Sequence, residues 1–243
     1  MKNRYTIIPL FSVIIFLIIV TIGISSCLND IGFCIVYELI YGITLSILVP
    51  IVYVKTKENL SLSSFGIKKL RLIDYIIILI FVVFSICGQL FTSDLSKIDF
   101  SLFHLSIMPL LMTTFFEEFL FRGFMQNRFE KNFGTISAIV LSGLIFSIYH
   151  LGYPGFRDFN DIILLFFVGI MFAVPFKLSN NNLIVSYLIN LPNAYLTYLL
   201  KFEQFPNFSL NFTIICIIGL ILTIFIFRLY FKKYNKESYS LYE

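Results

Sequence analysis

Long apolar stretches separated by short polar segments run along the whole chain. About eight of them approach the roughly 20 apolar residues that a helix needs to cross a bilayer. They are residues 5–24, 31–54, 72–91, 103–121, 134–150, 162–176, 183–200 and 212–230. The pattern predicts an all-α, polytopic membrane protein with about eight transmembrane helices.

The composition agrees with this pattern. Hydrophobic residues make up 58% of the 243 residues and charged residues 13%, whereas soluble domains have about 45–50% apolar and about 25% charged residues. The net charge is +4, but the basic residues occupy short loops between apolar stretches. We therefore expect the lipid bilayer, and no nucleic acid, as a partner.

Loops rich in basic residues alternate with loops that are poor in them. Of the 18 Lys and Arg residues, only Lys97, Arg157 and Lys201 lie in the poor set. By the positive-inside rule, this alternation predicts an even number of spans with both termini cytoplasmic. No repeat or soluble domain interrupts it, so residues 1–243 are predicted to form a single membrane domain. The frequent Ile, Phe, Asn and Lys residues favour the cytoplasmic membrane of a bacterium.

The N-terminal stretch has two interpretations. Lys2 and Arg4 precede its apolar residues and Cys27 follows them, an order that resembles a bacterial lipoprotein signal peptide. The stretch is also long enough to span a membrane, and the alternation of the loops requires it as a first helix. We therefore expect a membrane helix.

Glu117, Glu118 and Arg122 lie within or directly after the apolar stretch 103–121. A charge at the bilayer centre costs roughly 2.5–3.5 kcal/mol on insertion scales, so such a cluster is a functional site by default. On a helix Glu118 faces Arg122, whereas Glu117 is rotated by about 100°. Two carboxylates against one arginine leave an excess negative charge, which favours a raised proton affinity for one of them, and a glutamate tuned in this way is suited to act as a general base on water. The alternative is an ion pair that only locks two helices.

His150 ends the next apolar stretch and shares a helix face with Phe146. If the chain turns near residues 131–134, Glu117 lies about 15 residues before the turn and His150 about 18 after it. At 1.5 Å per residue their heights differ by about 4 Å, so the two side chains can meet across an antiparallel pair. The alternative is an interior histidine that takes no part in chemistry.

Asn190 is a third polar residue in an apolar stretch. It lies about 12 Å into the seventh predicted helix, at a depth compatible with that of Glu117. The alternative is a hydrogen bond between helices near a kink at Pro192.

A metal site is not expected. Catalytic zinc usually takes three protein ligands, but the chain has only 2 histidines and no H-E-x-x-H motif, and His104 lies about 20 Å from Glu117 along one helix. The cysteines form no C-x-x-C pair and are expected to be small buried hydrophobic residues: Cys27, Cys34, Cys87 and Cys216. No cofactor is therefore predicted, and water activated by a glutamate is the simpler chemistry.

The order Glu117-Glu118-x-x-x-Arg122 and then Phe146-x-x-x-His150 resembles the first two motifs of the CPBP family. This family contains type II CAAX prenyl proteases and bacteriocin-processing or immunity proteins, and is also called the Abi family. The resemblance covers a core at residues 105–200. It implies that Glu117 activates water with help from His150, while Glu118 and Arg122 organise the site.

The third motif of the family, His-x-x-x-Asn, is taken to form an oxyanion site. Here the chain departs from the family, because Asn190 stands where the histidine is expected and Ala194 where the asparagine is expected. An amide donor at Asn190 can still polarise a carbonyl group.

Three functions remain open from the sequence. The first is an intramembrane endopeptidase that cleaves a peptide or protein near the cytoplasmic face, such as a CAAX-like or bacteriocin-like small membrane-associated precursor. The second is an inactive member of the family that acts as an immunity or regulatory binding protein. The third is a transporter that uses Glu117 and Glu118 for proton coupling, although no paired broken helices in two related halves support it.

Overall fold

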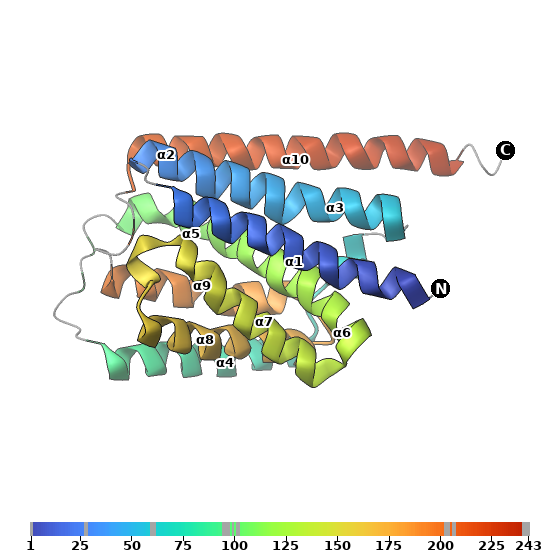
Figure 1. The fold of residues 1–243 in the computed structure, drawn as a ribbon. Helices are drawn as coiled ribbons and strands as arrows, with labels where there is room; N and C mark the ends of the chain where they lie inside the picture. Colours follow the sequence, from blue (N-terminus) through green and yellow to red (C-terminus); the bar gives the residue numbers. More distant parts are fainter. Residues whose placement is uncertain are drawn as a thin grey trace.

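A computed structural model of the chain describes residues 2–26, 29–58, 62–93, 98, 100, 103–201, 205 and 208–239. These residues form helices and connecting loops, and no strand occurs among them (Figure 1). Cys27, on which the lipoprotein interpretation depends, lies outside the described residues.

The helices follow the predicted apolar stretches closely. Two of the predicted spans contain π-helical turns, and three short segments are 3₁₀ helices. The elements are α1 (Lys2–Ser25), α2 (Asp30–Cys34), η1 (Ile35–Leu48), α3 (Val49–Tyr53), η2 (Val54–Glu58), η3 (Leu62–Phe65), α4 (Leu72–Thr92), α5 (Phe103–Glu118), η5 (Phe119–Gln126), α6 (Asn127–Phe133), α7 (Thr135–Tyr149), η6 (His150–Gly152), η7 (Pro154–Phe156), α8 (Phe159–Leu178), α9 (Leu183–Leu200) and α10 (Leu210–Tyr239).

Within the described residues, five helices are long and apolar enough to cross a membrane by length and composition. They are Ile31–Glu58, Leu72–Phe91, Thr135–Gly152, Phe159–Leu178 and Leu183–Leu200. Within the residues whose side chains are described, α1 and α10 contribute the apolar segments Phe11–Ser25 and Leu210–Phe225. The chain is thus a helical, multi-pass membrane protein.

The helices pack side by side, and the two termini lie at the same end of the bundle (Figure 1). The long helix formed by α5, η5 and α6 runs through the interior, where α5 contacts η1, α9 and α10. Helices α4 and α8 lie on the outside. This arrangement surrounds α5 with other helices, so its polar side chains are shielded from lipid.

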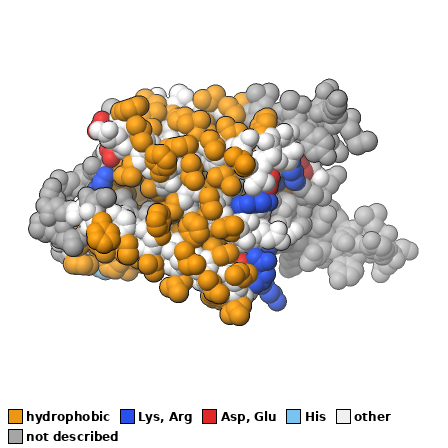
Figure 2. Space-filling model, turned by 90° about the horizontal axis from the view of Figure 1, so that it is seen from below, with side chains coloured by type: hydrophobic (Ala, Val, Ile, Leu, Met, Phe, Trp, Pro, Cys, Tyr) orange, Lys and Arg blue, Asp and Glu red, His pale blue; other side chains and the backbone are white. Residues whose placement is uncertain are grey.

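The outer face of α4 is apolar. Leu79 and Ile80 are 64% and 59% exposed, as suits side chains that face hydrocarbon instead of water. Figure 2 shows this side of the molecule, where hydrophobic side chains cover most of the surface and charged ones lie towards its edges. Cys34 and Cys216 are buried as predicted, whereas Cys87 is exposed on α4, because that helix turns most of its residues outwards.

Helices α7 and α8 approach each other closely through two glycines. A Cβ atom built on Gly169 would lie 2.8 Å from the Cα of Gly143, and one built on Gly143 would lie 3.0 Å from the carbonyl oxygen of Phe166. Small residues allow such backbone contact, which stabilises helix pairs in membranes. The contact holds α8 against the helix that carries His150.

Candidate active site

A helical hairpin brings the two sequence motifs together. The helix that starts at Phe103 continues through η5 and α6 to Phe133, and the chain reverses at Gly134, whose φ of 80° is readily adopted by glycine. Helix α7 then runs back alongside it and ends at Tyr149, next to His150. The predicted turn is therefore confirmed.

Glu118 and Arg122 form a buried ion pair on this hairpin. The Nη1 atom of Arg122 lies 3.4 Å from Oε1 of Glu118, and neither side chain is exposed. Arg122 also donates a hydrogen bond of 2.8 Å from Nη2 to the carbonyl oxygen of Gly169, and its guanidinium lies 4.7 Å from the ring centre of Phe146. The charge of Glu118 is thus balanced by a cation that α7 and α8 hold in place.

Asn190 joins the two glutamates from α9. Its Nδ2 atom donates to Oε1 of Glu118 at 2.9 Å and to Oε2 of Glu117 at 3.5 Å. The second contact is long for a hydrogen bond, so one of the two amide hydrogens has only a weak partner. That hydrogen is available to a second acceptor in the cavity.

Glu117, His150 and Asn190 line one cavity of about 90 Å³. This volume is enough for several water molecules next to polar partners. Apart from these three residues its wall is mostly apolar or aromatic, with further hydroxyl and amide groups: Leu110, Thr113, Thr114, Phe146, Tyr153, Phe156, Leu165, Val168, Asn193, Ala194, Thr197 and Phe205. A carboxylate, an imidazole and an amide therefore face the same small space.

The hydrogen bond of His150 determines which of its nitrogens can act. Nδ1 lies 2.8 Å from the carbonyl oxygen of Phe146. A carbonyl can only accept, so Nδ1 carries the proton and Nε2 is left with a lone pair. His150 is half-buried, and Nε2 can accept a hydrogen bond from a water molecule in the cavity.

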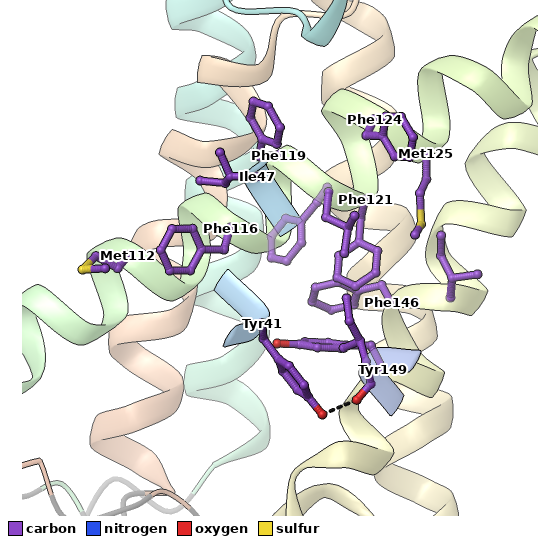
Figure 3. Close-up of a cluster of buried hydrophobic side chains, with 14 of the residues drawn as sticks. Tyr41, Ile47, Met112, Phe116, Phe119, Phe121, Phe124, Met125, Phe146 and Tyr149 are labelled. Atoms are coloured by element: carbon purple, nitrogen blue, oxygen red, sulfur yellow. Dashed lines mark hydrogen bonds between the residues drawn. The ribbon is translucent and has the colours of Figure 1, made fainter. Parts of the chain in front are cut away.

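Aromatic side chains close the interior around the hairpin. The ring centre of Phe121 lies 5.6 Å from that of Phe146 and 5.2 Å from that of Tyr149, and the three side chains pack together in Figure 3. The hydroxyl groups of Tyr149 and Tyr153 are 2.7 Å apart. This packing gives the polar groups of the site a surrounding of low dielectric constant, where their interactions are strong.

Glu38 is a polar residue of the site that the motifs did not reveal. It lies on η1, is 2% exposed, and accepts a hydrogen bond of 2.6 Å from the hydroxyl group of Thr113, which lines the cavity. The signal was present in the sequence, because Glu38 is an acidic residue within the apolar stretch 31–54. The rule that singled out Glu117 applies to it equally.

Within the described residues, no group of three or more His, Cys, Asp or Glu side chains is placed to hold a metal ion. The donors that line the cavity are one carboxylate and one imidazole, together with amide and hydroxyl groups.

Comparison with known proteins finds one family model that matches part of the chain. Residues 99–194 match the family model described as type II CAAX prenyl endopeptidase, Rce1-like. The matched segment contains all five of Glu117, Glu118, Arg122, His150 and Asn190, and the match supports the assignment of the chain to the CPBP family of CAAX proteases. No curated protein and no solved structure matches the chain.

Proposed function

We propose that this chain, assigned to the CPBP family by its segment 99–194, is an intramembrane endopeptidase that cleaves a peptide bond with water activated by Glu117. One observation carries the proposal: Glu117, His150 and Asn190 come from three different helical segments and line one cavity inside the bundle. Burying a carboxylate in this way costs free energy, so a buried carboxylate in a membrane helix indicates a functional site.

The proposed reaction needs no covalent intermediate. Glu117 takes a proton from a water molecule that also donates a hydrogen bond to Nε2 of His150, and the water oxygen attacks the carbonyl carbon of the peptide bond. The weakly bound amide hydrogen of Asn190 stabilises the negative oxygen that forms. When the C–N bond breaks, Glu117 returns the proton to the leaving nitrogen, so the products are a carboxylic acid and an amine.

Glu118 and Arg122 organise this site without touching the reacting atoms. Arg122 balances the charge of Glu118, and Glu118 fixes the amide of Asn190 through the hydrogen bond of 2.9 Å. We assign them positioning roles.

We further propose that all eight apolar stretches cross the membrane of a bacterial cell, with both termini cytoplasmic and residues 105–200 as the catalytic core of a single membrane domain. The even number of crossings fits the two termini, which lie at one end of the bundle (Figure 1). Lys68, Lys131 and Lys177 lie at that same end, on the loop after η3, on α6 and at the end of α8.

Asn190 supports a second candidate function, peptide binding without cleavage. The family motif has a histidine at this position, and here the amide is already hydrogen-bonded to Glu118. A chain in which this contact excludes the substrate would act as an immunity or regulatory protein that binds a peptide without cleaving it.

The test is to incubate the purified protein in proteoliposomes with a library of apolar peptides and small membrane-associated precursors, and to identify products by mass spectrometry. We expect new termini with the wild-type protein and with Glu130→Gln, a matched change on the same long helix, but not with Glu117→Gln. Binding without cleavage by any variant, together with a cellular phenotype that survives Glu117→Gln and His150→Phe, would support the second function instead.

A further inference from the structure

The catalytic cavity lies towards one end of the bundle. On α5 its wall extends from Glu117 back to Leu110, in the direction of Phe103, and on α9 it extends from Asn190 to Thr197, in the direction of Leu200. The remaining wall residues come from the end of α7, from the segment 150–156 that follows it, from the first half of α8 and from Phe205. The cavity thus lies towards the end opposite to the two termini.

The other end of the interior is filled by packed side chains. Beyond Glu117 along the long helix, Phe121, Phe124 and Met125 are at most 1% exposed. Gln126 donates to the carbonyl oxygen of Ala173 at 2.9 Å, which ties η5 to α8. Arg128 forms a buried ion pair of 3.1 Å with Glu58 of η2. A substrate has no open path to Glu117 through this packed region.

A second, larger cavity continues the catalytic one towards the end opposite to the termini. It measures about 440 Å³, within the range of about 300–1,000 Å³ typical of ligand sites. It lies between α4, α8 and α9, and we call it the α4–α8 groove. Five residues line both cavities and make them neighbours: Phe156, Leu165, Val168, Asn193 and Thr197.

The wall of the α4–α8 groove is apolar except for a row of hydrogen-bonding side chains. Ser85 donates to Oδ1 of Asn193 at 2.7 Å, Gln89 donates to the carbonyl oxygen of Asn193 at 3.1 Å, and Thr197 donates to Oε1 of Gln89 at 3.2 Å. An ion pair of 3.3 Å between Lys201 and Asp161 stands at the end of the groove.

This row indicates which kind of molecule fits the groove. A hydrocarbon chain forms no hydrogen bonds with donors and acceptors along its path. A peptide must satisfy its backbone N–H and C=O groups wherever it leaves water, and amide and hydroxyl side chains can do so by exchanging partners. The apolar walls, with Phe84, Leu164 and Met171, suit apolar side chains of the same peptide.

We propose that the α4–α8 groove binds the apolar peptide segment next to the scissile bond, and that the peptide enters from the extracytoplasmic end of the bundle. The inference rests on the proposed peptidase function and on the cytoplasmic position of the termini. It departs from the cleavage near the cytoplasmic face that the sequence alone had favoured, because the cavities extend from Glu117 away from the basic end. The expected substrates are therefore peptides with an apolar segment that is exposed to the outer side of the membrane.

Cysteine labelling tests this assignment. Gly88 lines the α4–α8 groove and a Cβ there meets no atom within 4 Å, so Gly88→Cys adds a thiol without a clash. In right-side-out vesicles an impermeant thiosulfonate added outside should label Gly88→Cys. A thiol at Lys131→Cys, exposed on α6 at the basic end, should react only after permeabilisation. A peptide substrate at ten times its Kd should slow labelling of Gly88→Cys about tenfold, because only the free protein reacts.

Cys87 is the matched control, because it is the neighbouring residue on α4 and does not line the groove. Its labelling should not depend on the peptide. The proposal is overturned if the peptide protects both thiols or neither of them. It is also overturned if Gly88→Cys is labelled only after permeabilisation. Protection is measured in the Glu117→Gln background and cleavage with the wild-type protein. If the peptide protects Gly88→Cys but is not cleaved, the peptidase function is refuted and the groove remains a peptide-binding site. If the peptide is cleaved but gives no protection, only the proposal for the groove is refuted.

Discussion

Asn190 is the residue at which the proposed chemistry departs most from the family motif. It stands between two buried carboxylates, and its amide donates to Glu118 at 2.9 Å and to Glu117 at 3.5 Å. The first contact fixes the side chain, and the second leaves a hydrogen for a carbonyl oxygen in the cavity. A fixed donor at that position is what an oxyanion needs, since it requires no rearrangement during the reaction.

Replacing Asn190 should separate these roles. Asn190→Ala removes the donor, and we expect cleavage to slow by about 10²–10³-fold, the usual effect of losing one oxyanion donor. Asn190→His supplies an N–H at the same position and should retain more activity than the alanine variant. Cleavage rates and thermal unfolding in detergent check this. An alanine variant that cleaves at the wild-type rate would remove Asn190 from the mechanism.

We expect substitution of Arg122 to lower the free energy of unfolding, because this residue holds the site in place and does not touch the reacting atoms. Its guanidinium is fully buried against Glu118, so Arg122→Met leaves a buried carboxylate without its cation. Loss of one partner of a buried pair destabilises by about 3–5 kcal/mol.

Arg157→Met is the control, because Arg157 is exposed on a loop and surface changes usually alter stability by less than about 0.5 kcal/mol. Chemical unfolding in detergent measures both variants. Equal stability of the two would show that Glu118 finds its charge balance elsewhere.

The sequence was informative where residues close in the chain determine the geometry. The contact of Glu118 with Arg122 follows from a spacing of four, and the position of Glu117 and His150 at one cavity follows from one short turn. The partnership of Glu38 with Thr113 joins two helices far apart in sequence. No local period reveals which side chain a distant helix presents, so this pair was missed.

At the level of elements, the contact between α7 and α8 supports the site from outside. Gly169 allows α8 to approach α7, and its carbonyl oxygen accepts the hydrogen bond from Arg122. The position of Arg122 thus depends on a backbone contact that only small residues permit.

Gly169→Ala should therefore lower stability and activity together, because its Cβ would lie 2.8 Å from the backbone of Gly143 and would push the helices apart. Overpacking of this kind typically costs about 1–3 kcal/mol. Gly88→Ala is the matched control, since its Cβ meets no atom within 4 Å. Thermal unfolding of both variants checks the prediction, and a Gly169→Ala protein as stable as Gly88→Ala would contradict the role of this contact.

The π-helical turns of η5 could not be predicted from the sequence. All eight residues of η5 are buried, including Arg122 and Gln126. Arg122 and Gln126 are four residues apart and form a polar face inside the bundle, which predicts a helix but does not distinguish π-helical from α-helical turns. The sequence therefore predicted a helix here but not its winding.

For the whole molecule, the apolar pattern predicted where the helices lie. Of the roughly eight predicted spans, five are long and apolar enough to cross a membrane within the described residues. The stretch 103–121 falls outside the five helices identified as candidate spans, because Glu117, Glu118 and other polar residues lower its hydropathy. The residues that we propose as functional thus lower the hydropathy of the helix that carries them.

The proposed orientation can be measured on the intact protein. Both ends of the chain lie at the end of the bundle where the basic loops gather, so we expect a green fluorescent reporter to fold and fluoresce at either terminus. An alkaline phosphatase reporter, which needs an oxidising compartment, should be inactive at both. An active phosphatase at either terminus would contradict the orientation and, with it, entry from the outer side.

The central claim is that Glu117 activates the water that cleaves the peptide. The most direct measurement is the cleavage rate of one peptide by the wild-type protein and by Glu117→Gln, side by side in buffer with a metal chelator. Removal of a general base lowers a rate by about 10²–10⁴-fold, so we predict cleavage by the wild-type protein in chelator and a loss of that size in the variant. Equal rates for the two proteins, or wild-type cleavage that the chelator abolishes, would contradict the account.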